Sequence, residues 1–402
     1  MLTRIRRRHF TLRISQRVRH RLRARDYADE VVKAVFLTSL TLKHFRNFSS
    51  QELEFAPGFN IFVGQNAQGK TNIIEAISFL CTSKSFRSNE FRDMIEWNEE
   101  ASLVRAKVKG ERGEDEWKAS LTPHKKTLLK NDKRLSVKSF RGLHCVLFAP
   151  EEILILKDSP SARRRYVDQV ITRFVPAYAK LIREYERVVS QRNKIFSDER
   201  ISFSEKQRLL SDWNPQLVDK AVHIMLHRHE WLSRFNAQLA VAYHNICSHD
   251  GTAFFEYTPH AGKAFLSSRE ALFARMQELL AERANDEFVR RTSLVGPHRD
   301  DCLAQLNGAQ VKHFGSQGQH RSFVLAMKFA EMELYKEVYQ EMPILLLDDV
   351  MSELDAKRNQ TFFEYLHSNH GQVFVSTTDD SPLNNWSLQE QKRFRVEAGE
   401  VR

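Results

Sequence analysis

Cysteine is scarce in this sequence, and a long apolar run is missing from it. The four cysteines among 402 residues are scattered without a CxxC pair, which excludes a disulfide framework or a cysteine zinc site and suits a reducing compartment. The longest apolar stretch, around Ile344–Leu347, falls far short of the about 18 residues that span a bilayer. The arginine-rich N-terminal region also lacks the apolar segment of a secretory signal. We therefore expect a cytoplasmic protein that does not enter the membrane.

Acidic residues are outnumbered, but the excess positive charge is unevenly placed. The formal net charge is +11; residues 1–34 hold ten Arg and one Lys against three acidic residues, a net +8, so the remaining 368 residues carry only +3. We expect residues 1–35 to form a basic N-terminal extension that is disordered or precedes the true start of the protein. The alternative is an arm that binds nucleic acid phosphates.

A glycine-rich loop carries the clearest chemical signal. A short apolar run of strand type precedes it at 58–63, and apolar residues at helical spacing follow from Ile73 to Leu80. Strand, glycine loop and helix are the context in which such a loop binds nucleotide phosphates, with its lysine at the terminal phosphates and its threonine hydroxyl on Mg²⁺. The predicted nucleotide-binding residues are Gly64, Gln65, Asn66, Ala67, Gln68, Gly69, Lys70 and Thr71.

Two acidic residues, Asp348 and Asp349, follow a second apolar run. That run predicts a buried parallel strand, and ligands bind at the carboxyl ends of such strands in an open α/β sheet. We predict that Asp348, with Thr71, serves a Mg²⁺ ion. We also predict that Asp349 orients or deprotonates the attacking water, with Lys70 as the second catalytic residue. The alternative is a helix N-cap after a core strand.

A second anion site is predicted at the start of another helix. The sequence from Gly315 to Gln319 precedes a helical run over 323–335, and Ser316 can cap that helix. Its bare N–H groups favour an anion, and Gly318 allows a ligand to approach the backbone closely. The alternative is a simple turn and cap.

Together these motifs resemble an ABC-type ATPase head. The resemblance implies that two molecules enclose two ATP molecules, with Ser316, Gly318 and Gln319 acting on the nucleotide of the partner copy. It also implies that Asp355 lies at the dimer interface and that Thr378 occupies the switch position. Because Asp349 stands where glutamate is usual, we expect slow ATP turnover. The rival classes are a transport ATPase subunit and an SMC-like chromosome clamp.

The spacing of the motifs narrows the class. Thr71 and Ser316 are 245 positions apart, farther than in transporter subunits and much closer than in coiled-coil clamps. The insert carries apolar residues at helical spacing over 178–196 and from Leu217 to Ile246, so we expect two helices that pair antiparallel. We predict an α/β P-loop ABC-type ATPase head with mixed sheets at 36–150 and 290–402, and an inserted, mainly helical lobe at 151–289.

Finer motifs resemble the RecF family of recombination mediators over residues 36–402. They are LTSLTLKHFRNF (37–48), KSFRS (84–88), FAPEEILILKDSPSARRRYVD (148–168), LVGPHRDD (294–301), SQGQHRS (316–322) and LLLDDVMSELD (345–355). The resemblance implies a weak ATPase that uses ATP and Mg²⁺ and dimerises with ATP. It also implies binding of single- and double-stranded DNA, with a preference for gap junctions, and loading of RecA together with RecR and RecO.

Some residue roles follow from this resemblance alone. Arg46 and Asn47 are expected to reach the phosphates or base of the nucleotide, and a turn with a solvated charge is the alternative. Arg163, Arg164 and Arg165 are candidates for DNA phosphates or, equally, for ion pairs with neighbouring acids. No base-reading helix stands out, so we expect recognition of DNA shape and backbone.

Overall fold

A computed structural model of the chain describes residues 35–110, 113–135, 143–247, 251–353, 356–368, 371–379 and 390–402. All of them belong to one compact unit, residues 33–402. The predictions for residues 1–34 and for Asp355 therefore lie outside the described residues. In the described ranges, none of the helices combines the length and apolar character that a membrane crossing requires.

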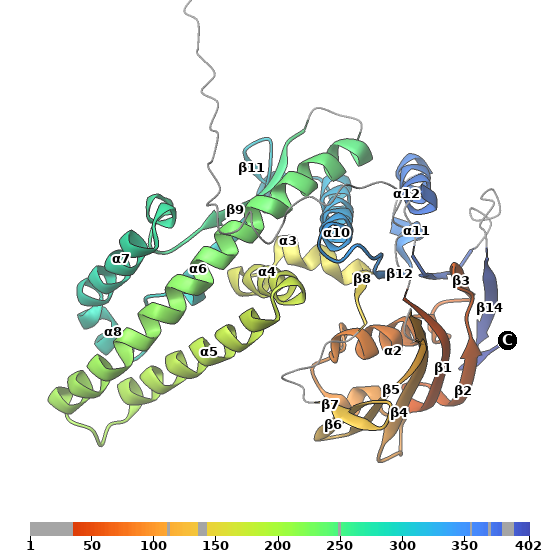
Figure 1. Cartoon of the computed structure of the whole chain (residues 1–402), viewed down its shortest axis with the longest axis horizontal. Helices are drawn as coiled ribbons and strands as arrows, with labels where there is room; N and C mark the ends of the chain where they lie inside the picture. The colour runs from red at the N-terminus through yellow and green to blue at the C-terminus, as the bar shows by residue number, and fades with distance from the viewer. Residues whose placement is uncertain are drawn as a thin grey trace, which may run out of the picture. The chain divides into compact units, whose positions relative to one another are not determined.

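A mostly parallel six-stranded sheet carries the predicted motifs (Figure 1). Its order is β15-β14-β3-β13-β12-β8, and only β15 pairs antiparallel. The strands are β3 (Phe59–Val63), β8 (Cys145–Phe148), β12 (Ile344–Asp348), β13 (Val373–Thr377), β14 (Lys392–Glu397) and β15 (Glu400–Val401). The predicted strand before the glycine loop and the predicted buried parallel strand before the acidic pair are both confirmed.

An antiparallel sheet of order β2-β1-β4-β5-β6-β7 lies across helix α2 (Lys70–Thr82) from the parallel sheet. Its strands are β1 (Phe36–Phe45), β2 (Phe48–Glu54), β4 (Ser102–Gly110), β5 (Gly113–Thr122), β6 (Lys125–Lys130) and β7 (Lys133–Leu135), and the short helix η1 (Phe91–Met94) precedes β4.

A three-stranded sheet and most of the helices make up the remainder. The sheet order is β11-β10-β9, from β9 (Ala253–Thr258), β10 (Asp301–Leu306) and β11 (Ala309–Gln310). The helices are η2 (Pro150–Ile153), α3 (Leu154–Lys157), α4 (Pro160–Phe174), α5 (Pro176–Ser197), α6 (Phe203–Cys247), η3 (Lys263–Ser267), α7 (Arg269–Glu282), α8 (Ala284–Arg290), η4 (Pro297–Arg299), α9 (Val311–Phe314), α10 (Gln317–Tyr339), α11 (Val350–Glu353) and α12 (Ala356–Ser368).

Helices α5 and α6 form the antiparallel pair that the apolar spacing predicted (Figure 1). The division into an ATPase lobe and a helical lobe stays a prediction. Strands β9 and β10, which lie on opposite sides of the boundary at residue 290, pair in one sheet. The expected α/β fold with mixed sheets and helices is confirmed.

Strand alternation explains why the parallel sheet has a core on each face. Ile344 and Leu346 of β12 pack with the cluster that contains α2 and the antiparallel sheet. Leu345 and Leu347 pack with the cluster that contains α4, α6 and α10. Because side chains alternate between the two faces of a strand, a continuous apolar run can fill both cores. The parallel sheet is thus packed against a core on each of its two faces.

Candidate nucleotide-binding site

The predicted phosphate loop connects β3 to α2 at the carboxyl edge of the parallel sheet. Residues 65–67 are exposed, and helix α2 begins at Lys70 directly after the loop. Gly69 has φ +117°, and a Cβ there would lie 2.8 Å from Nδ2 of Asn47. A Cβ on Gly64 would lie 2.2 Å from the carbonyl oxygen of Val396. Both glycines are therefore required by backbone conformation or close packing, as the motif indicated.

The side chain of Lys70 folds back over the loop. Its Nζ donates hydrogen bonds to the carbonyl oxygens of Gly64 and Gln65, both at 2.7 Å. Burial lowers the pKa of Lys70, while the charges of Asp349 and Asp348 act in the opposite direction. The ammonium group thus lies among the loop carbonyls, where phosphate oxygens can take their place as acceptors.

Thr71 and Asp348 meet at the same edge. The Thr71 hydroxyl donates to Oδ1 of Asp348 at 2.9 Å, and Ser376 of β13 donates to the same oxygen at 2.6 Å. Burial raises the pKa of Asp348, and the hydrogen bonds from Ser376 and Thr71 oppose that rise. A hydroxyl beside a carboxylate is the oxygen donor set that a hard Mg²⁺ ion prefers, so these residues fit the metal role predicted for them.

Asp349 has an unusual backbone conformation. Its φ is +48°, a left-handed conformation that aspartate tolerates better than most residues. Its N–H donates to the Ser376 hydroxyl at 3.0 Å and to the Ser376 carbonyl at 3.2 Å. Thr378, the predicted switch residue, is exposed just after β13, which lies between β3 and β12. The fold therefore brings Lys70, Thr71, the two aspartates and Thr378 to one edge.

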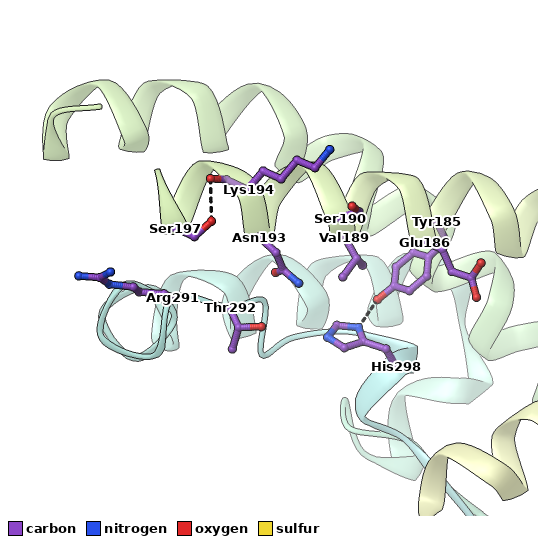
Figure 2. A pocket seen from close by; sticks show the side chains of 10 residues that line it. All are labelled: Tyr185, Glu186, Val189, Ser190, Asn193, Lys194, Ser197, Arg291, Thr292 and His298. Atoms are coloured by element: carbon purple, nitrogen blue, oxygen red, sulfur yellow. Dashed lines mark hydrogen bonds between the residues drawn. The ribbon is translucent and has the colours of Figure 1, made fainter. Parts of the chain in front are cut away.

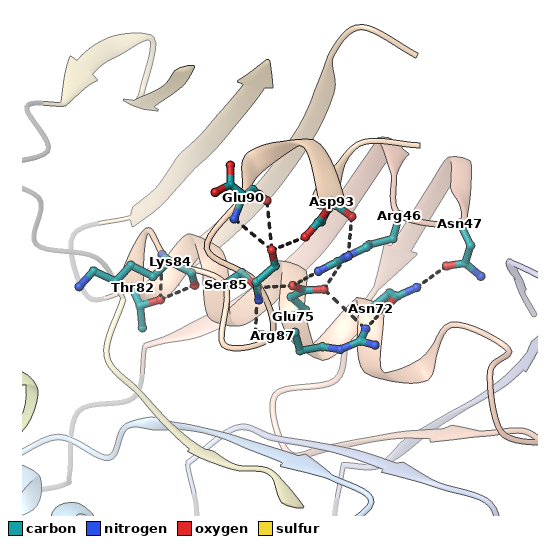
Figure 3. A network of polar contacts seen from close by, with 11 residues as sticks. Arg46, Asn47, Asn72, Glu75, Thr82, Lys84, Ser85, Arg87, Glu90 and Asp93 are labelled. Atoms are coloured by element: carbon teal, nitrogen blue, oxygen red, sulfur yellow. Dashed lines mark hydrogen bonds and ion pairs between the residues drawn. The ribbon is translucent and has the colours of Figure 1, made fainter. Parts of the chain in front are cut away.

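Arg46 and Asn47 form the turn between β1 and β2, and their side chains have different partners (Figure 3). The Asn47 side chain donates to the Gln68 carbonyl at 3.1 Å. Arg46 instead makes two hydrogen bonds, at 2.6 and 2.8 Å, to the carboxylate of Glu75, which is fully buried in α2. Arg46 is thus neither a solvated turn residue nor a contact of the loop, while Asn47 does reach the loop.

The same network contains residues to which the sequence reading gave no role. Asn72 donates to Asn47 at 2.7 Å, and Arg87 donates to Asn72 at 2.8 Å (Figure 3). Arg87 lies 3.9 Å from the Glu75 carboxylate, and its charge lowers the pKa of Asp348. In the sequence, the sign of this buried network is Glu75, a glutamate within an apolar helical run.

Ser316 caps α10 as expected. Its hydroxyl accepts from the Gln319 N–H at 3.2 Å, and the Gln319 side chain accepts from the Ser316 N–H at 2.8 Å, which is a complete capping box. Ser316 and Gln317 are exposed, whereas Gly318 is half-buried. Among the described residues, the hydrogen bonds of Ser316 and Gln319 stay within this helix start and do not reach the phosphate loop.

The three consecutive arginines have separate environments. Arg163 is 4% exposed and forms a two-bond ion pair with Asp301, at 2.9 and 2.7 Å, so it takes the ion-pair role that the sequence left open. Arg164 donates to the Asp300 carbonyl at 2.6 Å. Arg165 is exposed. Arg163 is therefore withdrawn as a DNA contact, because reaching DNA would leave Asp301 without this partner.

A separate cavity of about 520 Å³ lies between α5 and residues 291–298 (Figure 2). On its wall the Tyr185 hydroxyl and Nδ1 of His298 are 2.6 Å apart. Burial lowers the pKa of His298 to about 4. The lining combines charged, hydroxyl, amide, phenol and imidazole groups with one valine, and it includes none of the predicted nucleotide-binding residues, so the cavity is distinct from the phosphate site.

One further group of side chains has ligand types that can bind a metal. Nδ1 of His44 lies 2.7 Å from a Glu96 oxygen and 3.7 Å from a Glu99 oxygen, next to the β1–β2 turn. All three side chains are partly exposed, and His–Glu ion pairs of this kind also form without an ion. The sequence reading did not identify this group, because His44 and Glu96 are distant in the chain.

The phosphate loop, the acidic pair beside it and the serine-capped helix define the head of an ABC-type ATPase. In agreement, residues 36–399 match the model of the RecF/RecN/SMC N-terminal domain family. The SMC head from Pyrococcus furiosus shares the fold, with a TM-score of 0.52 at 16% identity over 92% of this chain and 95% of that one.

More specific similarity lies within this class. The DNA replication and repair protein RecF of Geobacter sp. strain M21 is 36% identical over 370 residues, which are 91% of this chain and 99% of that protein. RecF of Listeria innocua serovar 6a is 34% identical over 384 residues with the same shares. A structure of the recombination mediator protein RecF with ATP matches with a TM-score of 0.83 at 28% identity, over 92% of this chain and 99% of that one. The chain belongs to the RecF family.

Proposed function

We propose that this protein is an ATP-binding, DNA-repair ATPase that closes as a dimer on DNA. The observation that carries the proposal is the arrangement at the sheet edge, where Lys70 lies over the phosphate loop and Thr71 is hydrogen-bonded to Asp348. Family membership supports ATP binding and a role in DNA replication and repair. Each ATP site is proposed to be built by two copies of the protein. The start of α10, which is exposed and capped by Ser316, supports its role as the part that the second copy contributes.

The hydrolytic half of the site is assigned to four residues. Lys70 binds the terminal phosphates, and Thr71 and Asp348 are the residues that would hold Mg²⁺. Asp349 orients the attacking water. Its side chain is one methylene shorter than the glutamate usual in this class, which supports a weak ATPase. Mg²⁺ supplies charge neutralisation at the phosphates when it is bound.

Dimer closure is assigned to the other half-site. Ser316, Gly318 and Gln319 of one copy contact the terminal phosphate held by the other, and Asp355 and Thr378 complete the interface. A nucleotide that bridges two half-sites stabilises the dimer by its own binding energy, and hydrolysis removes that bridge. ATP can favour the dimer only if it binds the closed dimer more tightly than the separate copies.

DNA is the proposed partner of the closed dimer, in single- and double-stranded form and with a preference for gap junctions. Arg165, exposed on α4, is the arginine of its triplet that remains available for a phosphate. We also propose that the protein is cytoplasmic and works with RecR, and with RecO and RecA in the same pathway. A structure of a relative described as part of the RecFOR pathway supports this assignment.

The test combines sedimentation with DNA binding. Purified protein is measured with Mg²⁺ and ATP, ADP or a slowly hydrolysed ATP analogue, each with and without gapped, blunt and single-stranded DNA. We expect the analogue to produce dimers and ADP to leave monomers, and we expect dimers to bind gapped DNA more tightly at low salt. Protein that binds the analogue but never DNA would support a transport ATPase subunit instead.

A further inference from the structure

A group of charges connects the sheet edge to α10; it is buried at Lys328 and Glu331 and half-buried at Glu152 and Arg173. Lys328 in α10 is 2% exposed and pairs with Glu152 of η2; its Nζ also lies 3.1 Å from Glu331. Glu331, also 2% exposed, accepts from the Tyr166 hydroxyl at 2.7 Å and pairs with Arg173 of α4. Two acids and two bases therefore join η2, α10 and α4 in one network.

One end of the network lies beside the nucleotide site. Strand β8 pairs with β12 so that Phe148 is the partner of Leu347, the residue before Asp348. Helix η2 starts two residues after Phe148, and the charge of Glu151 is close enough to raise the pKa of Asp348. Glu152 therefore directly follows Glu151, the residue whose charge acts on the Asp348 carboxylate.

The other end lies on the helix that presents Ser316. Lys328 and Ser316 are 12 positions apart, which corresponds to about 18 Å along a helix axis. Because α10 is a continuous helix from Gln317 to Tyr339, a contact that fixes Lys328 also fixes the rotation and height of the Ser316 end. A shift of η2 draws Lys328 with it, because Glu152 is one of the two carboxylates that stabilise this buried ammonium group and losing either is costly.

Stability alone does not explain these charges. Burial raises the pKa of Glu152 to about 7 against the opposing charge of Lys328, so its ionised form is held at a cost. Buried ion pairs can often be replaced by apolar residues of similar volume without loss of stability. Such a pair is better suited to fixing one relative position of two elements than to strengthening the core.

We propose that the Glu152–Lys328 pair is a positioning contact that transmits ATP binding at the sheet edge to the Ser316 end of α10. The proposal rests on the proposed function, because it concerns how the same site orders its trans-acting half. Glu152 and Lys328 are positioning residues and do not touch the nucleotide. Removing the link separates ATP binding from the response of α10 while leaving both sites in place.

Hydrogen exchange of the α10 start provides the main test. Amides of residues 317–322 are followed with and without ATP and Mg²⁺ in wild type, Glu152→Gln, Lys328→Met and the double variant. A surface control is Glu337→Gln, because Glu337 is also on α10 and pairs with Arg234 at 2.8 Å but is half exposed. We expect ATP to slow amide exchange in wild type and in the control, and to have little effect on exchange in the other variants. All variants should bind ATP with an affinity within about threefold of wild type.

The double variant separates positioning from stability. It leaves no Glu152–Lys328 charge unpaired, so its free energy of unfolding should return towards wild type while the α10 response stays lost. Its ATP-dependent dimerisation should also be weaker by about tenfold or more, as measured by sedimentation. Wild-type exchange at α10 in the double variant would overturn the proposal, as would an unresponsive α10 in wild type. A wild-type protein that stays monomeric while its α10 responds would defeat the dimer mechanism alone.

Discussion

Replacing Ser316 with alanine separates two roles that our account gives to one hydroxyl. In the monomer this hydroxyl caps α10, accepting from the Gln319 N–H at 3.2 Å. Loss of a serine cap costs about 1 kcal/mol of folding free energy. Because the cap is exposed and the Gln319 side chain still bonds to the backbone of residue 316 at 2.8 Å, we expect a destabilisation of this size and no larger.

The effect on dimerisation should be larger. A hydrogen bond from Ser316 to an anionic phosphate is worth about 1.5–3 kcal/mol, and a symmetric dimer contains it twice. The Ser316→Ala dimer should thus be weaker by about 3–6 kcal/mol, which is about 10²- to 10⁴-fold in its dissociation constant. ATP binding to the monomer should stay within about twofold, because among the described residues Ser316 makes no hydrogen bond to the phosphate loop.

Another serine cap provides the matched control. Ser268 caps α7 by accepting from the Ala271 N–H at 3.2 Å, the same distance as in α10. Ser268→Ala should therefore cost a similar folding free energy in urea titrations and leave dimerisation unchanged. Dimerisation is measured by sedimentation with a slowly hydrolysed ATP analogue and Mg²⁺. If Ser316→Ala dimerises like wild type, or if Ser268→Ala is equally impaired, the assignment of Ser316 to the partner's nucleotide is wrong.

Three further changes test other parts of the account. Lys70→Ala should weaken ATP binding by about 100-fold or more in calorimetry, because two charge-assisted hydrogen bonds are lost; near-normal affinity would contradict the phosphate role. Arg165→Ala should lower the slope of log DNA affinity against log salt by about one, whereas Arg163→Ala should lower the free energy of unfolding by about 3 kcal/mol and leave that slope intact. The pKa of His298 is depressed to about 4 in the folded state, so the unfolded state binds more protons between pH 6.5 and 4. Acidification through that window should therefore reduce the free energy of unfolding by up to about 3 kcal/mol. His298→Gln should remove that part of the pH dependence in urea titrations. If the free energy of unfolding of this variant depends on pH as in wild type, burial of His298 is not the cause.

The sequence could predict the parts of the site that are local in the chain. The phosphate loop requires a strand, two constrained glycines and a helix start within residues 59–82, and each has its own residue pattern. The run before Asp348 is apolar at every position because both faces of β12 are covered. The cap at Ser316 needs only the next three residues. In all three cases the deciding contacts lie a few residues apart.

Contacts between distant segments could not be predicted in this way. Which arginine of the triplet is buried depends on how α4 packs against β10, where Asp301 lies 138 positions away from Arg163. Likewise, the pairing of Arg46, a predicted nucleotide-binding residue, depends on Glu75 on the buried side of α2 and on the Asp93 carbonyl, 29 and 47 positions away. The sequence shows which charged residues are present, but it does not show which of them pair in the fold.

Strand β13 explains why the phosphate loop and the acidic pair form one site. The phosphate loop follows β3 and the acidic pair follows β12, and β13 separates these strands. The last residues of β13 contact both sides: the Thr377 carbonyl accepts from the Gly64 N–H at 3.3 Å, and the Ser376 hydroxyl donates to Asp348 while accepting from the Asp349 N–H. Ser376 is fully buried. The segment from Val373 to Asp379 therefore does more than supply the exposed Thr378, because Thr377 contacts the phosphate loop while Ser376 contacts Asp348 and Asp349.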